Sequence, residues 1–132
     1  MRVLYVTSEV FPYAKTGGLA DVSAALPVAL KELGIDIRVL VPGYRQALER
    51  VRDIKQTIPL GDPLGCGDVR LLETHLTHSD VPVWLVDCPQ LYLRQGGLYQ
   101  SEGGAHWPDN ALRFALLNHV AAGIANEPGR AW

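Results

Sequence analysis

Two stretches near the start of the chain are apolar on both faces, and an alanine- and leucine-rich stretch lies between them. Arg2–Thr7 and Asp36–Val41 have the pattern of strands buried in a parallel sheet. Leu19–Leu33 is rich in helix formers and is followed by Gly34, which favours the end of a helix. Pro27 predicts a kink or a split in this helix. Together these elements predict a strand, helix and strand crossover with the two strands parallel.

The middle of the chain has shorter patterns, separated by glycine and proline. We expect a short helix over Arg45–Arg52, an edge strand near Ile54–Ile58, and strands over Val69–Leu76 and Val81–Asp87. Pro89–Gly104 predicts a long loop without regular structure, of the kind that often carries function.

A closing helix is predicted over Pro108–Asn126, with Asp109 and Asn110 in ordinary capping positions. Its apolar positions are spread over a wide surface, which indicates packing on more than one side. For Glu127–Trp132 we expect no regular structure. The whole pattern predicts the α/β class, with a Rossmann-like parallel sheet between two layers of helices.

Composition narrows the class of protein. The 132 residues, 48% hydrophobic and 20% charged, fit a single domain. A net charge of −2 without any block of like charge argues against nucleic-acid or membrane partners. The sequence has neither the apolar span of about 18 residues that a membrane helix needs nor a secretory leader. Cys66 and Cys88 form no CxxC pair, so we expect a cytoplasmic protein with reduced thiols.

The loop between the first strand and the first helix carries the candidate chemistry. Glu9, Lys15 and Asp21 are the only charged residues between positions 3 and 30, and all lie on or beside this loop. Ligands bind at the carboxyl ends of strands in open α/β sheets. The pair Gly17-Gly18 would allow close backbone approach, and the start of the following helix favours an anion. With Lys15 as a mobile cation, the loop is predicted to bind phosphate.

Simpler interpretations remain open for each part of this loop. It matches neither the Walker pattern nor the GxGxxG fingerprint, and a Gly-Gly turn can serve tight packing alone. An acid at Asp21 is favoured in any first helical turn, and Glu9 can be a solvated side chain. Elsewhere, His75 and His78 on one strand would point to opposite faces, so no metal site is expected. A GxSxG nucleophile turn is absent.

The motifs of the chain resemble the bacterial glycogen synthases and plant starch synthases. The most specific block is Lys15–Val22 (KTGGLADV), preceded by Ser8-Glu9 and Pro12. Leu91-Tyr92, Arg94, Gly96-Gly97 and Tyr99 resemble the family's LYxR…Y loop, although Leu93 stands where LYDR has an aspartate. Its PDNxxRF helix is matched by Pro108-Asp109-Asn110 and Arg113-Phe114.

This resemblance implies the partial N-terminal domain of a glycosyltransferase-B fold over residues 1–132, with the C-terminal nucleotide-binding domain absent. The implied reaction transfers glucose from ADP-glucose to an α-1,4-glucan with retention, without a metal or other cofactor. Lys15 is expected to contact the donor and Gly17-Gly18 to lie beside its diphosphate. Glu9, Asp21 and Tyr92 complete the implied substrate-binding set, and no catalytic residue is assigned.

Two other functions stay open from the sequence. A non-catalytic remnant or binding module would keep the Rossmann-like half without chemistry, and another nucleotide-sugar transferase could share the fold. As an N-terminal fragment, the isolated chain is expected to be inactive, because transfer needs both walls of the cleft. The prediction for Lys15 fails if its ammonium group is locked in an internal salt link that points away from the groove.

Overall fold

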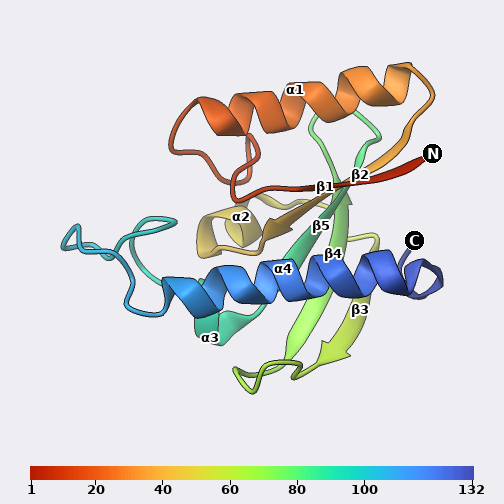
Figure 1. Ribbon diagram of the computed structural model, residues 1–132. Coiled ribbons are helices and arrows are strands. Elements are labelled where there is room, and N and C mark those ends of the chain that lie inside the picture. Colours follow the sequence, from red (N-terminus) through yellow and green to blue (C-terminus); the bar gives the residue numbers. More distant parts are fainter.

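A computed structural model describes residues 1–132 and contains a five-stranded sheet with helices on both faces (Figure 1). The strands are β1 (Arg2–Val6), β2 (Asp36–Pro42), β3 (Gln56–Gly61), β4 (Val69–His75) and β5 (Pro82–Asp87). The helices are α1 (Gly18–Glu32), α2 (Arg45–Arg50), α3 (Pro89–Tyr92), α4 (Asn110–Asn126) and the 3₁₀ turn η1 (Pro128–Arg130).

The strand order is β1-β2-β5-β4-β3. β1 pairs parallel with β2, and β2 parallel with β5, whereas β5–β4 and β4–β3 are antiparallel pairs. Four strands therefore run in one direction and β4 runs against them. The α/β, Rossmann-like class is confirmed, but the sheet is mixed. The connections 62–68 and 76–81 are too short for a parallel crossover, which needs about a dozen residues.

The strand register places α1 and the chain's C-terminal end on opposite faces of the sheet. Tyr5 is the partner of Val39 in the ladder, and the Tyr5 hydroxyl lies 3.4 Å from Ser23 Oγ on α1. On the alternate face, the Arg38 guanidinium lies 5.0 Å from the Trp84 ring and 4.9 Å from the Trp132 ring. Helix α4 contacts β1 and β2 (Figure 1), which completes the three predicted layers.

Most predicted elements are present, and three expectations are wrong. Helix α1 runs through Pro27 without a break, since the proline removes only the hydrogen bond to the carbonyl four residues back. The expected loop from Pro89 begins with α3, which has proline in its first turn. Residues after Glu127 form η1, and the Trp132 amide donates to the Pro128 carbonyl at 2.8 Å.

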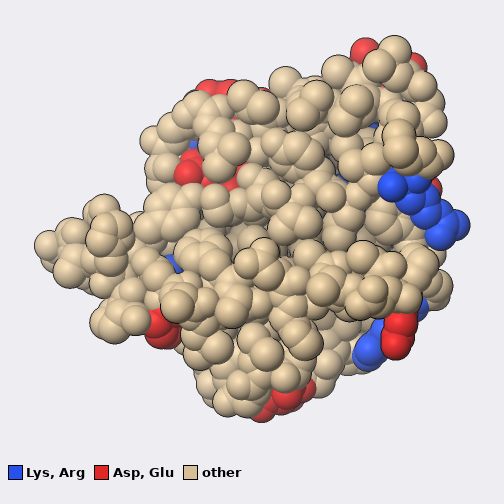
Figure 2. All heavy atoms as spheres, viewed as in Figure 1, with Lys and Arg blue, Asp and Glu red and all other residues tan.

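On the side of the molecule seen in Figure 2, charged side chains lie toward the margins and the centre is uncharged. This face therefore has no basic patch of the kind that nucleic-acid binding requires. None of the helices combines the length and the apolar character that crossing a membrane requires.

Candidate functional site

The loop after β1 is held firmly by its own apolar side chains. Val10 and Ala14 are fully buried and Tyr13 is 5% exposed. The Ala14 amide donates to the Val10 carbonyl at 2.9 Å, and the Phe11 amide donates to the Ala20 carbonyl at 3.1 Å. The loop is thus tied to the first turn of α1. The backbone just before Lys15 is therefore held in place, and the Lys15 side chain extends from it into solvent.

Lys15 and Asp21 form an exposed ion pair at the start of α1. The Lys15 ammonium group donates to both carboxylate oxygens of Asp21 at 2.8 Å. The two side chains are 43% and 57% exposed, so the pair is a surface pair rather than an internal salt link. Exposed pairs of this kind contribute about 1 kcal/mol or less to stability, and the ammonium group can exchange Asp21 for a stronger anion.

The two glycines of the loop are not required by packing. Gly17 has an extended backbone at φ −162° and ψ −156°, and a Cβ added at Gly17 or at Gly18 would meet nothing within 4 Å. The interpretation of this pair as a tight-packing device is therefore wrong. Gly43, by contrast, is required, because a Cβ there would lie 2.8 Å from the Val86 carbonyl oxygen. The space over Gly17 and Gly18 is open to a ligand.

The N-terminus of α1 has no side-chain cap. The first amides of a helix have no partner within the helix and carry its positive dipole end. Lys15 and this end of the helix therefore bring together a cation and backbone donors. This combination suits a phosphate or diphosphate group.

The Glu9 side chain points to the inner side of the loop and not to its surface. It is 4% exposed, which excludes the solvated side chain that was one interpretation of the sequence. The Thr16 amide donates to Glu9 Oε1 at 2.6 Å, and the Tyr99 hydroxyl donates to Oε2 at 2.6 Å. Burial by itself raises the pKa of Glu9, but hydrogen bonds from Tyr99, Thr16 and Gly17 outweigh it, so the pKa lies below its ordinary value of 4.5.

Tyr92 lies in the core and not on the surface that carries Lys15. It is 2% exposed, its hydroxyl donates to the Arg113 carbonyl, and its ring meets Tyr44 edge-on with centroids 5.8 Å apart. Burial raises its pKa. These contacts explain Tyr92 through packing. The structure therefore brings Lys15, Gly17, Gly18 and Asp21 together on one surface, with Glu9 on the inner side of the loop.

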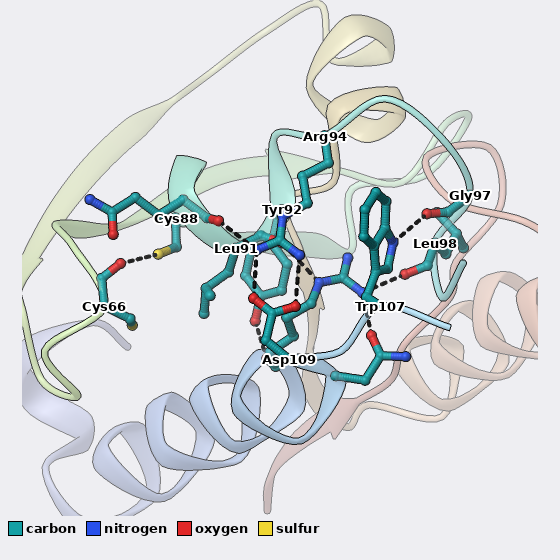
Figure 3. Close-up of polar contacts among 12 residues, drawn as sticks. Cys66, Cys88, Leu91, Tyr92, Arg94, Gly97, Leu98, Trp107 and Asp109 are labelled. Carbon is teal, nitrogen blue, oxygen red and sulfur yellow. Dashed lines mark hydrogen bonds and ion pairs between the residues drawn. The ribbon is translucent and has the colours of Figure 1, made fainter. Parts of the chain in front are cut away.

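The LYxR and PDNxxRF motifs meet in a cluster that fixes the loop between α3 and α4 (Figure 3). The Arg94 guanidinium donates to both carboxylate oxygens of Asp109, at 2.7 and 2.5 Å. Asp109 therefore makes no side-chain cap on α4, unlike the capping role expected from the sequence. Leu93, at the position of the family's aspartate, is 49% exposed and plays no part in this cluster.

Arg113 extends this cluster into the core, a role that the sequence did not predict. It is 1% exposed and donates to the carbonyls of Leu91 and Leu98, each at 2.8 Å, and to Asn110 Oδ1 at 2.8 Å. The only signal in the sequence was helical spacing, which places Arg113 in the same row as Leu116, Leu117 and Val120. These residues are buried in α4, as Arg113 is. Burial lowers its pKa.

A cavity of about 260 Å³ lies between α4, η1, β3 and β4 and is lined by none of the predicted site residues. The predicted site is instead an open surface at the carboxyl end of β1. No group of three or more His, Cys, Asp or Glu side chains is placed to hold a metal ion.

Comparison with known proteins identifies the family. Residues 2–131 match the family model for the starch synthase catalytic domain. The chain is 53% identical over 124 residues to a glycogen synthase of Rhodospirillum rubrum, and 56% identical over 128 residues to one of Paramagnetospirillum magneticum. These matches cover 94% and 96% of this chain and 26% of each relative.

Among solved structures, the chain matches the catalytic domain of starch synthase IV from Arabidopsis thaliana bound to ADP and acarbose. The TM-score is 0.70 at 22% identity, with 96% of this chain and 25% of that chain covered. At this identity the match supports the fold alone. The chain spans about a quarter of the length of these relatives. The chain belongs to the starch synthase catalytic domain family.

Proposed function

We propose that this chain supplies the Lys15 wall of the donor site in a glycogen synthase. That enzyme transfers glucose from ADP-glucose to the non-reducing end of an α-1,4-glucan with retention of configuration. Support comes from the family, from relatives named glycogen synthase and from the ADP bound by the Arabidopsis structure. The single observation that carries the proposal is Lys15 beside an uncapped helix start with open space over two glycines.

The chemistry follows from the charge that develops during transfer. When the bond between glucose and the diphosphate breaks, negative charge grows on the departing ADP. Lys15 and the first amides of α1 would lie where that charge grows, and fixed donors of this kind stabilise a leaving group. Asp21 would hold the Lys15 side chain near the helix start until the diphosphate arrives.

The glucan acceptor and the adenine base of the donor are inferred from the family alone. A second wall of the cleft, in addition to the wall that this chain supplies, would have to orient them. The free thiols Cys66 and Cys88 are both buried. Unpaired cysteines fit our placement of the activity in the cytoplasm, where thiols stay reduced.

Removing the Lys15 ammonium group tests this function. Residues 1–132 would replace the matching segment of the Rhodospirillum rubrum glycogen synthase, and glucose transfer from ADP-glucose to glycogen would be measured. We expect Lys15→Ala to raise the KM for ADP-glucose about tenfold or more, because one charge-assisted hydrogen bond contributes about 1.5–3 kcal/mol.

Lys31→Ala is the matched control for this experiment. Lys31 lies at the other end of α1 and pairs with Asp80 at 2.9 Å, also on the surface. It should leave the KM unchanged. An inactive chimera, or equal KM values for the wild-type and Lys15→Ala chimeras, would refute the proposed function.

A further inference from the structure

The buried carboxylate of Glu9 makes four hydrogen bonds and has no cationic partner. Besides Thr16 N and Tyr99, it accepts from Thr16 Oγ1 at 2.7 Å and from the Gly17 amide at 3.4 Å. A buried carboxylate is costly unless its oxygens are hydrogen-bonded. Here both oxygens are used inside the protein, and none is left for a sugar hydroxyl.

These bonds join two loops that are distant in the sequence. Glu9, Thr16 and Gly17 belong to the loop after β1, whereas Tyr99 comes from the loop between α3 and α4. The Tyr99 hydroxyl also lies 2.8 Å from Ser8 Oγ. The carboxylate is therefore the point at which the second loop reaches the turn that leads into α1.

Tyr99 is itself fixed from the start of α4. The Trp107 amide and the Asn110 side-chain amide both donate to the Tyr99 carbonyl, at 3.1 and 3.0 Å. Arg113 holds the neighbouring Leu98 carbonyl at 2.8 Å, and Trp107 Nε1 donates to the Gly97 carbonyl at 3.2 Å (Figure 3). These four hydrogen bonds hold the backbone at Gly97, Leu98 and Tyr99, and so place the Tyr99 hydroxyl beside Glu9.

We propose that Glu9 and Tyr99 are positioning residues that set the Thr16–Gly17 turn, and with it Lys15 and the start of α1, for donor binding. Neither side chain contacts the donor. A carboxylate near a diphosphate would repel it, so its value here lies in fixing backbone geometry. Because Thr16 and Gly17 turn their amides inward to Glu9, the diphosphate meets the amides of Gly18 and Leu19. The donor in this inference rests on the proposed function.

Amide hydrogen exchange of the 132-residue chain tests the positioning role without any substrate. Glu9→Ala should speed exchange at Thr16 and Gly17 about tenfold or more, because their acceptor is lost. Tyr99→Phe removes only the hydroxyl and should give a smaller rise at the same amides. Glu9→Gln keeps an oxygen that accepts from Thr16 N and should largely restore protection.

Glu73→Ala is the matched control for the loss of a hydrogen-bonded glutamate. Glu73 accepts from Trp84 Nε1 at 2.7 Å on β4, away from the turn. It should leave the ratio of exchange rates between Thr16 and the sheet unchanged. Unaltered exchange at Thr16 and Gly17 in Glu9→Ala would overturn the inference. So would an equal rise throughout the sheet, which indicates a general loss of stability. If Glu9→Ala does not fold, Tyr99→Phe decides by the same criteria.

Kinetics of the chimera separate this inference from the proposed function. Glu9→Ala and Tyr99→Phe should raise the KM for ADP-glucose and leave the KM for glycogen unchanged, and Glu9→Gln should restore much of the loss. If Lys15→Ala has no effect on the donor KM but Glu9→Ala still frees the two amides, the donor assignment is wrong and the turn-setting role stands. If Lys15→Ala raises the KM and Glu9→Ala changes neither readout, the inference is wrong and the function stands.

Discussion

Lys15 and Glu9 differ in burial, and this difference separates their roles. Lys15 is an exposed cation with an exchangeable partner, whereas Glu9 is enclosed and fully hydrogen-bonded. Both were predicted from the sequence as substrate contacts, because sequence shows charge and position but not depth. In the folded chain, Thr16 and Tyr99 donate hydrogen bonds to both oxygens of the Glu9 carboxylate. The spacing between positions 9 and 99 gave no sign of that contact.

Alanine at the loop glycines separates a packing role from a ligand role. Gly18→Ala should leave the free energy of unfolding unchanged or raise it by up to about 1 kcal/mol, because the added methyl group meets open space and alanine favours a helix. The same variant should weaken the use of ADP-glucose in the chimera. Urea unfolding of the chain measures the first effect.

Gly43→Ala is the contrasting variant in that experiment. Its methyl group would lie 2.8 Å from the backbone oxygen of Val86, so we expect a loss of about 1–3 kcal/mol. If Gly18→Ala destabilises the chain as strongly as Gly43→Ala does, the glycine pair serves packing after all.

At the level of elements, hydrophobic pattern predicted β1, α1, β2, β5 and α4 well. The three strands are short apolar runs, and the two helices are long segments rich in alanine and leucine. β1, however, was expected to be buried and lies at the edge of the sheet, where it is only partly covered. α3 was missed because four residues give no periodic signal. Asp109 was assigned to a cap because an acid before a helix usually has that role. The contact that replaces it comes from Arg94, which only the folded loop brings near.

The ion pair between Arg94 and Asp109 predicts acid sensitivity. The hydrogen bond from Arg94 lowers the pKa of Asp109 below its ordinary value of 3.8, against the opposing effect of burial. A lowered pKa means that the pair contributes stability fully above pH 3.8 and loses it as the pH falls through the folded-state pKa. Asp109→Asn should therefore cost about 1–2 kcal/mol at pH 7 and much less in stronger acid.

Urea unfolding at several pH values checks this prediction. Asp80→Asn is the comparison, since Asp80 pairs with Lys31 on the open surface and should cost less at pH 7. An Asp109→Asn penalty that stays constant from pH 7 into acid would show that the carboxylate charge is not what stabilises the loop.

For the whole molecule, the sheet topology brings the ends of β1, β2 and β5 to one edge, and the segments that follow them meet there. The Tyr44 hydroxyl, after β2, donates to the Ser8 carbonyl at 2.9 Å, and Tyr99 reaches Glu9 from beyond β5. The rule that ligands bind at the carboxyl ends of strands in open α/β sheets predicted this edge as the ligand-binding side. The reversed β4 leaves that edge unchanged, because β1, β2 and β5 remain parallel.

The most direct measurement is an ADP titration of the 132-residue chain, followed through the backbone amide NMR signals. Binding of a diphosphate at the start of α1 predicts saturable shifts of the Gly18 and Leu19 amides, with a dissociation constant of about 1 mM for a few charge-assisted bonds. The shifts should persist in Lys31→Ala and vanish in Lys15→Ala. Amides at Gly18 and Leu19 that do not respond to ADP, or that respond equally in Lys15→Ala, would contradict the phosphate-binding role of this loop.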